Sequence, residues 1–258
     1  MTISILSTFY NDKEMLKRMM DSVLEQDYPD IEHVITDAAS TDGSVELIKE
    51  YQSKYEESGK KLVWLSERDR GLHDGDNKAA ALATGDYMMF GSDPYTGTDI
   101  ISTFAAVLEK GNLDYSYGGI YFHKDGKIIR TWSGKPGNWR LGWMAATPTL
   151  CFRRALWEKY GPFDLDYVSA SDYKFQIRLF KDKTLRSESI QRPLVCYYAG
   201  GVSNNGIKSN LVSIKENFRV MREEKVPFGW FTVICKMFIA SFAYIFHSHK
   251  KIDAEVHS

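Results

Sequence analysis

The sequence predicts an α/β protein in which helices flank a mostly parallel central sheet. Short apolar stretches of strand length alternate with segments of helical periodicity over residues 3–110. A chain that alternates in this way buries a Rossmann-like parallel sheet between two layers of helices. The 258 residues are 43% hydrophobic and 26% charged, which is a globular composition with enough length for one large core.

The first part of the chain repeats a strand-helix unit. Each expected strand is rich in Ile, Val, Leu or Phe, and a polar turn follows it. Two N-cap candidates, Asn11 and Asp12, precede a first helix in which Met15, Met19 and Val23 recur at four-residue spacing. We expect strands at residues 3–8, 31–36, 61–65 and 86–90, and further helices at 45–55 and 76–83.

After about residue 100 the pattern changes to α+β. We expect a helix at 100–110, strands at 115–122 and 127–132, and a helix at 173–180. No internal repeat, low-complexity tract or linker divides the chain. The sequence therefore predicts one domain over residues 1–225, followed at 226–258 by an apolar helix and a polar tail.

Charge and cysteine content exclude several classes of protein. A formal net charge of -1 gives no general attraction to nucleic acid, which binds to positive surfaces. The three cysteines, Cys151, Cys196 and Cys235, fit neither a disulfide framework nor a CxxC metal site. With no export signal visible at the N-terminus, we expect a cytoplasmic protein.

Two common phosphate-binding loops are missing from the sequence. Neither GxxxxGK[ST] nor GxGxxG is present, which argues against P-loop kinases and dinucleotide-binding dehydrogenases. Ligands of parallel sheets bind beyond the carboxyl ends of the strands, and carboxylates bind a diphosphate only through a metal ion. Acidic residues gather at the expected carboxyl ends, so we expect a site in which a metal ion joins carboxylates to a diphosphate. These residues are Asp37, Asp42, Asp69, Asp74, Asp76 and Asp93.

Four segments, in the same order, resemble the family 2 glycosyltransferases. Each match alone is weak, but four in order over residues 3–179 are specific. The resemblance implies a GT-A fold and inverting transfer from a nucleotide diphosphate-sugar, with the donor bound by residues 1–98 and the acceptor by 99–225. The segments are ISILSTFYNDKEMLKRMMDSVLEQDYPDIEHVITDAASTDGSVELI, DRGLHDGDNKAAALATGDYMMFGSDP, PTLCFRRALWEKYGPFDLDY and SASDYKFQIRL.

The resemblance implies that the first two strands end at the donor nucleotide. Asp37 stands where the family has the Asp that holds the base, although an Asp at a strand end also serves as a turn cap. Thr8 and Tyr10 would line the same pocket. Tyr10 would contact the base through its ring, or it is a plain aromatic at the rim of the core. The family's preference for uridine favours a UDP-sugar.

The resemblance also implies a divalent metal cofactor, Mg²⁺ or Mn²⁺. Gly91-Ser92-Asp93 stands in place of the family's acidic metal motif, so Asp93 is the one ligand kept and Ser92 is a donor contact. One carboxylate, two diphosphate oxygens and waters complete an octahedral ion, so we expect weak metal affinity without donor. Asn77 and Lys78 would contact ribose or phosphate; alternatively Lys78 is a solvated helix residue.

Asp172 is the candidate catalytic base that the resemblance implies. In an inverting transfer the acceptor hydroxyl attacks the anomeric carbon opposite the diphosphate, and a carboxylate takes the proton of that hydroxyl. The alternative is that Asp172 serves as the N-cap of the helix at 173–180. Both roles can coexist, because a helix N-terminus holds the side chain in place.

Residues 226–246 form an almost continuous apolar run with Lys236 near its middle. The run is long enough to span a bilayer, but a central lysine costs roughly 2.5 to 3.5 kcal/mol on insertion. We therefore favour a helix in the headgroup region, with lysines reaching the interface. Packing on the protein's own core or in a homodimer is the alternative. The side chains expected in the membrane are Trp230, Phe231, Phe238 and Phe242.

These inferences predict a glycosyltransferase at the cytoplasmic face of the inner membrane. It would transfer a sugar to a glycan or lipid-linked saccharide acceptor in bacterial surface polysaccharide or glycolipid assembly. The alternative is a non-catalytic sugar-nucleotide or glycan-binding protein with a degenerate site, which Gly91 keeps open. A nucleotidyltransferase is disfavoured, because no Gly-rich loop follows the first strand.

Overall fold

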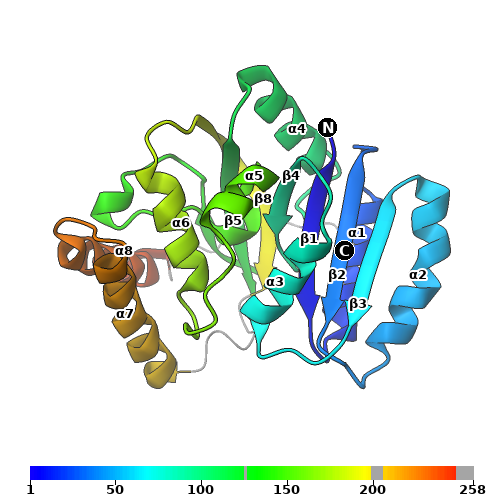
Figure 1. Cartoon of the computed structure of the whole chain (residues 1–258), viewed down its shortest axis with the longest axis horizontal. Helices are drawn as coiled ribbons and strands as arrows, with labels where there is room; N and C mark the ends of the chain where they lie inside the picture. The colour runs from blue at the N-terminus through cyan, green and yellow to red at the C-terminus, as the bar shows by residue number, and fades with distance from the viewer. Residues whose placement is uncertain (125–126, 199–205, 248–258) are drawn as a thin grey trace.

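The computed structural model describes residues 1–124, 127–198 and 206–247, with side chains for all of these except 206–209 and 240–247. Helices cover both faces of one central sheet (Figure 1). The strands are β1 (Ile3–Phe9), β2 (Ile31–Asp37), β3 (Lys61–Ser66), β4 (Tyr87–Phe90), β5 (Tyr115–Lys124), β6 (Lys127–Trp132), β7 (Cys151–Arg153) and β8 (Ser187–Tyr198). The helices are α1 (Lys13–Leu24), α2 (Ser44–Ser58), α3 (Leu72–Leu82), α4 (Ile100–Gly111), α5 (Arg154–Tyr160), α6 (Ser171–Lys181), α7 (Gly206–Glu223) and α8 (Gly229–His247), with 3-10 turns η1 (Trp139–Leu141) and η2 (Thr147–Thr149).

The sheet is mostly parallel, as the sequence predicts. Its strand order is β3-β2-β1-β4-β7-β5-β6, and β8 pairs with β5 outside this path. The pairs among β1 to β4 are parallel, as is the β5 and β8 pair, whereas β7 and β6 run antiparallel to their neighbours. The chain moves outward from β1 to β3 and then returns to β4 on the other side of β1. The strand order therefore reverses between β1 and β4, where such sheets bind their ligands.

Alternate residues of the central strands point into separate cores. Ile3 and Ile5 of β1 pack with residues of α1, α2 and α4 on one face. Leu6 packs with residues of α3, α5 and α6 on the other face, as the two-residue period of a strand requires. A third cluster joins α6 to α7 and α8, and includes Tyr173 and Val233. The C-terminal helix is thus packed directly on the helix that carries Asp172.

The predicted elements of the first half agree closely with the structure. The four strands begin and end within one residue of the predicted bounds, and Asp12 caps α1 by accepting from the backbone N of Met15. The predicted start of α3 at residue 76 is wrong, because the helix begins at Leu72. Gly75 hides this start, since glycine disfavours helices. A Cβ there would lie only 2.3 Å from Cγ2 of Thr8, so glycine lets α3 pack tightly against β1.

The start of α6 also differs from the prediction. The helix begins at Ser171 and its N-cap position is Ala170, so Asp172 lies inside the first turn rather than capping it. A side chain of α7 instead binds the segment that leads into the helix. Glu216 of α7 accepts hydrogen bonds from the backbone N of Val168, Ser169 and Ala170 at 2.7, 2.9 and 3.0 Å. The turn that precedes Asp172 is therefore fixed by α7.

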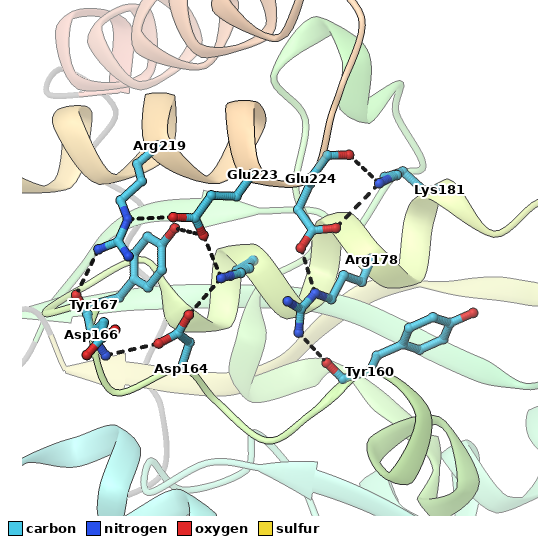
Figure 2. A network of polar contacts seen from close by, with 10 residues as sticks. Tyr160, Asp164, Asp166, Tyr167, Arg178, Lys181, Arg219, Glu223 and Glu224 are labelled. Atoms are coloured by element: carbon cyan, nitrogen blue, oxygen red, sulfur yellow. Dashed lines mark hydrogen bonds and ion pairs between the residues drawn. The ribbon is translucent and has the colours of Figure 1, made fainter.

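Charged residues bind α7 to α6 and to the segment before it (Figure 2). Lys174 of α6 forms ion pairs with Asp164 and with Glu223 of α7, both at 2.7 Å, and its side chain is only 8% exposed. Arg178 of α6 pairs with Glu224 of α7 at 2.7 Å. Because solvent screens such partly buried pairs less than exposed ones, this network holds α7, and the α8 that follows, in a defined position.

Helix α8 has one buried and one exposed face. Val233 is buried against α6 and α7, whereas Trp230, Phe231 and Phe238 are 57%, 45% and 71% exposed. The side chain of Phe242, the fourth residue expected to enter a membrane, lies outside the described residues. Within the described ranges, the structure contains no helix with the length and hydropathy that crossing a bilayer requires.

Candidate active site

Three predicted donor-binding residues lie at the carboxyl edge of the sheet. Thr8 and Asp37 are at the ends of β1 and β2, and Ser92 follows β4. The hydroxyl of Ser92 accepts from the backbone N of Thr8 at 3.2 Å and donates to the carbonyl of Thr8 at the same distance. Ser92 therefore joins β1 to the end of β4 at the point where the strand order reverses.

Asp37 has one oxygen in use and one free. Its Oδ2 accepts from the backbone N of Ser40 at 3.0 Å and from the hydroxyl of Ser66 at 2.6 Å. Its Oδ1 is buried and makes no hydrogen bond to any described residue. A buried carboxylate oxygen without a donor is costly. This oxygen is therefore suited to accept an N–H from a ligand such as a nucleobase.

Two side chains of α3, Asp76 and His73, lie beside the end of β1. The hydroxyl of Thr8 donates to Oδ1 of Asp76 at 2.8 Å, and Nδ1 of His73 lies 3.8 Å from Oδ2 of the same carboxylate. Burial raises the pKa of Asp76, and the negative charge of Asp172 adds to this rise. Thr8 and Asp76 therefore join the end of β1 to α3, which shares a hydrophobic core with α6, the helix that carries Asp172.

The other residues predicted to contact the donor differ in exposure and in the hydrogen bonds that they already make. Tyr10 is 65% exposed, so its ring is accessible for stacking. Asn77 exchanges two hydrogen bonds with the backbone of Phe163, at 2.9 and 2.8 Å. Lys78 donates to the carbonyl of Arg68 at 2.7 Å and pairs with Glu67 at 2.8 Å. Asn77 therefore joins α3 to the segment before α6, and Lys78 joins α3 to the segment after β3. Each side chain has one further N–H that could make the predicted contact with donor.

Asp93, the predicted metal ligand, is a half-buried carboxylate. Its Oδ1 accepts from the backbone N of Tyr198 at 3.1 Å. Burial raises the pKa of Asp93 to about 6, and the nearby Asp12 adds to the effect. A cation beside such a carboxylate would lower its pKa again, so the residue fits a divalent ion. No three His, Cys, Asp or Glu side chains among the described residues could hold a metal together.

The carboxylate of Asp172 is held in place by neighbours on α6 and η2. Its Oδ1 accepts from the backbone N of Tyr173 at 2.7 Å, and its Oδ2 accepts from the hydroxyl of Thr147 at 2.8 Å. That hydroxyl in turn accepts from the side-chain amide of Gln176 at 3.0 Å. This chain of hydrogen bonds fixes the orientation of the carboxylate, which a general base requires.

Asp172 borders a polar cavity of about 190 Å³. The cavity lies between α6, η2 and the two C-terminal helices. Within the described part of the chain, the buried atoms Tyr173 OH and Gln176 Oε1 have no hydrogen-bond partner. Both residues line the cavity, together with Met144, Ala145, Thr147, Ser169, Asp172, Ser213, Asn217 and Lys236. The arrangement provides a proton acceptor beside a space with unsatisfied polar groups.

The expectation that Lys236 reaches a membrane interface is wrong. Its ammonium lies 3.5 Å from the centre of the Tyr173 ring and donates to Oδ1 of Asn217 at 3.3 Å. The side chain points inward because α8 packs its Lys236 face on α6. Sequence reasoning also missed Thr147 and Gln176. The only sequence signal was a single lysine in an otherwise apolar run, since a charge at such a position needs a polar destination.

Sequence comparison connects the chain to known enzymes. The model of the family described as glycosyl transferase family 2 matches residues 4–172. The PGL/p-HBAD biosynthesis glycosyltransferase of Mycobacterium bovis (strain BCG / Pasteur 1173P2) is 26% identical over 211 residues, 78% of each chain. The UDP-Glc:alpha-D-GlcNAc-diphosphoundecaprenol beta-1,3-glucosyltransferase WfaP of Escherichia coli is 26% identical over 232 residues, which cover 85% of this chain and 90% of that one.

Solved structures share the fold. The S. aureus TarS 1-349 structure in complex with UDP-GlcNAc has a TM-score of 0.67 and 21% identity over 86% of this chain. The match covers 65% of the TarS chain, slightly less than two thirds of its length. The mannosyltransferase PcManGT from Pyrobaculum calidifontis, in complex with GDP-Man and Mn2+, has a TM-score of 0.61 and 18% identity, over 93% of this chain and 75% of that one.

The α/β sheet agrees with the fold of these structures, and the family match defines the class of protein as glycosyltransferase. The match over residues 4–172, which ends at the candidate base, covers more than half of the sequence. The chain belongs to glycosyl transferase family 2 and is a glycosyltransferase.

Proposed function

We propose that this enzyme transfers a sugar from a nucleotide diphosphate-sugar, preferably a UDP-sugar, to a hydroxyl of a glycan or lipid-linked saccharide, with inversion at the anomeric carbon. The observation that carries the proposal is the fixed Asp172 carboxylate beside a polar cavity, on a helix that shares a core with α3. The names of two similar proteins support the substrates: TarS was solved with UDP-GlcNAc, and WfaP uses UDP-Glc and a diphosphoundecaprenol-linked GlcNAc.

In the proposed step Asp172 acts as the general base. The acceptor hydroxyl gives its proton to the carboxylate while its oxygen forms a bond to the anomeric carbon. The bond from that carbon to the diphosphate breaks, and its electron pair stays on the diphosphate oxygen. Attack opposite the leaving group inverts the configuration without a covalent intermediate. The bond from Thr147 keeps one carboxylate oxygen in place during the transfer.

The donor is held by the carboxyl edge of the sheet. Asp37 accepts an N–H of the base through its free Oδ1, and Tyr10 stacks on the base. Asp93 holds a Mg²⁺ or Mn²⁺ together with the diphosphate. When bound, the ion supplies positive charge that stabilises the leaving diphosphate.

Thermal denaturation with a panel of nucleotides and nucleotide-sugars tests the donor site. We expect one UDP-sugar to raise the melting temperature in Mn²⁺ and to lose most of this effect in chelator, because Asp93 supplies too few ligands alone. GDP-sugars serve as the matched comparison for the base. A panel in which no nucleotide raises the melting temperature contradicts the proposal.

Donor hydrolysis separates an enzyme with this site from a binding protein that has lost turnover. We expect the wild type to hydrolyse its donor slowly, and Asp93→Ala to weaken metal-dependent donor binding on the order of 10²-fold. Donor binding with no hydrolysis and no transfer, unchanged in Asp93→Ala, would instead support the non-catalytic alternative.

We also propose that the exposed face of α8 contacts the cytoplasmic surface of a membrane. Exposed Trp230, Phe231 and Phe238 support this, because aromatic side chains on a helix favour the lipid interface. Wild-type protein should sediment with phosphatidylglycerol and phosphatidylethanolamine vesicles, and a Trp230→Ser, Phe238→Ser double variant should not. If the double variant instead separates a wild-type homodimer that ignores vesicles, the face is a dimer interface and this part of the proposal is wrong.

A further inference from the structure

The cavity beside Asp172 contains a positive charge that the transfer step does not use. Lys236 of α8 points into it, and among the described residues no carboxylate forms an ion pair with its ammonium. Its contacts are the face of the Tyr173 ring and a long hydrogen bond of 3.3 Å to Asn217. An ammonium has three N–H donors, so most of its hydrogen-bonding capacity faces the cavity.

Asp172 does not neutralise this charge at close range. Both carboxylate oxygens are engaged elsewhere, one by the hydroxyl of Thr147 and one by the backbone N of Tyr173. Burial lowers the pKa of Lys236 to about 8, and the charge of Asp172 only partly opposes this shift. A buried lysine in a close ion pair would have its pKa held up by the partner. Among the described residues, no carboxylate therefore compensates the burial of the Lys236 ammonium at close range.

Two further groups in the cavity lack partners. Tyr173 and Gln176 are 4% and 2% exposed, and neither Tyr173 OH nor Gln176 Oε1 makes a hydrogen bond to a described residue. Buried polar atoms are nearly always paired in native proteins. Together with the ammonium, they form a set of groups that one polar, negatively charged molecule could satisfy.

The position of Lys236 is fixed by its surroundings. Gly142, at φ +85°, lies so close to α8 that a Cβ there would come within 2.2 Å of the backbone N of Lys236. On the other side, α8 packs on α6 and α7 through Val233, and the ion pairs of Figure 2 hold α7 on α6. The ammonium is thus placed in the cavity wall by backbone contact rather than by a mobile side chain at the surface.

We infer that Lys236 binds an anionic oxygen group of the acceptor, a phosphate or a carboxylate, and so makes the enzyme select acidic acceptors. Tyr173 and Gln176 bind hydroxyls of the same molecule. The inference rests on the proposed function, because it assigns this cavity to the acceptor. It gives α8 a role in specificity that is independent of any contact between its outer face and a membrane.

Binding of three small sugars to the UDP-loaded protein tests the inference. The probes are GlcNAc 1-phosphate, glucuronate and the neutral methyl glycoside of GlcNAc, titrated by calorimetry. We expect at least one anionic sugar to bind about 10-fold or more tightly than the neutral one, as a charge-assisted hydrogen bond provides. Preference for the sugar phosphate indicates a phosphorylated lipid carrier, and preference for glucuronate indicates an acidic glycan.

Substitutions at Lys236 assign the preference to this residue. Lys236→Met keeps the length of the side chain and should abolish the preference for the anion, whereas Lys236→Arg should retain it. Lys215→Met is the matched control, because Lys215 is exposed on α7 and does not line the cavity. Melting temperatures of all variants show whether they fold.

Two results would overturn the inference: equal binding of anionic and neutral sugars by the wild type, or an anion preference that Lys236→Met keeps. Either can occur while UDP and donor hydrolysis behave as proposed, in which case only the role of Lys236 is wrong. If UDP does not bind and no donor is hydrolysed, the proposed function fails instead, whatever the sugars do.

Discussion

The donor edge and the acceptor cavity are built in opposite ways. At the donor edge several polar side chains already bind other groups, as Thr8 does with Asp76 and as Ser92 does with the β1 backbone, whereas Oδ1 of Asp37 has no partner among the described residues. In the cavity, by contrast, Tyr173, Gln176 and Lys236 all present groups that the described part of the chain does not satisfy. The first region is a continuation of the sheet, and the second is assembled from helices far apart in the sequence.

This difference indicates how the two regions tolerate change. Residues of the donor edge are part of the hydrogen bonding that joins strands and helices, so their loss affects folding and donor binding together. Polar groups that face the cavity without a described partner stabilise the fold less, so their removal should affect transfer or acceptor binding with less effect on stability. Variants in the two regions should therefore separate into two classes.

The largest effect is expected in the cavity. Asp172→Asn should lower the rate of transfer by about 10²- to 10⁴-fold, because it removes the proton acceptor. Donor affinity should stay within about twofold, since the amide keeps the bond from Thr147 and the shape of the side chain. The measurement is single-turnover transfer beside donor titration. Asp166→Asn, at an exposed position nearby, is the matched control. Full transfer activity in Asp172→Asn would exclude it as the base.

Within the donor half, residues 1–98, substitution of Glu32 should cause the largest loss of stability. This fully buried carboxylate accepts from Ser4, Lys61 and Thr84. Burial alone would raise the pKa of Glu32, but the hydrogen bonds from Lys61, Ser4 and Thr84 lower it to about 2. Glu32→Gln should therefore lower the free energy of unfolding at pH 7 by about 3 kcal/mol.

The stability that the Glu32 carboxylate contributes should depend on pH. Because the folded-state pKa of Glu32 lies below its unfolded value of 4.5, the stabilisation is complete above that pH and is lost as the pH falls toward about 2. Urea unfolding should show that the difference in the free energy of unfolding between wild type and Glu32→Gln is smaller at pH 3 than at pH 7. Glu25→Gln, at an exposed site, is the control. An equal difference at both pH values would mean that the charge of the Glu32 carboxylate does not cause the stabilisation.

A smaller effect is expected from substitution of Asp37, whose Oδ1 has no hydrogen-bond partner among the described residues. Asp37→Asn can keep the two bonds to Oδ2 through its amide oxygen while replacing the free Oδ1 by an N–H donor. Affinity for UDP should fall by about 10-fold, as the loss of one buried hydrogen bond predicts. Ser66→Ala removes a bond to Oδ2 only, and should leave UDP affinity less affected. The reverse order in calorimetric titration would show that Oδ1 does not meet the base.

The smallest effect is expected at Tyr10, which is mostly exposed and makes its contribution only when donor is bound. Tyr10→Leu should weaken UDP binding by about 2- to 10-fold through the loss of ring stacking, with little change in melting temperature. Tyr10→Phe should keep wild-type affinity. If Tyr10→Leu binds UDP as well as Tyr10→Phe does, the ring is not part of the site.

The sequence was most informative where local rules decide the structure. Strands β1 to β4 and the cap at Asp12 followed from apolar runs and polar turns, and Thr8, Asp37 and Ser92 then met at one edge because parallel strands end together. The start of α3 was missed because Gly75 is explained only by its contact with Thr8. The cavity could not be predicted, since Thr147, Gln176 and Lys236 meet through helix packing that no local pattern encodes.

Gly142 packs against the backbone of α8 at Lys236, so α8 closes one side of the cavity. This packing has a practical consequence for protein production. The exposed aromatic residues of α8 invite removal of the C-terminus to improve solubility, and a stop after residue 228 would take the whole helix away. Such a truncation would also open the side of the cavity that Lys236 closes. We expect the shortened enzyme to bind donor but to let water compete with the acceptor, so that it would assay as a hydrolase of its own sugar nucleotide.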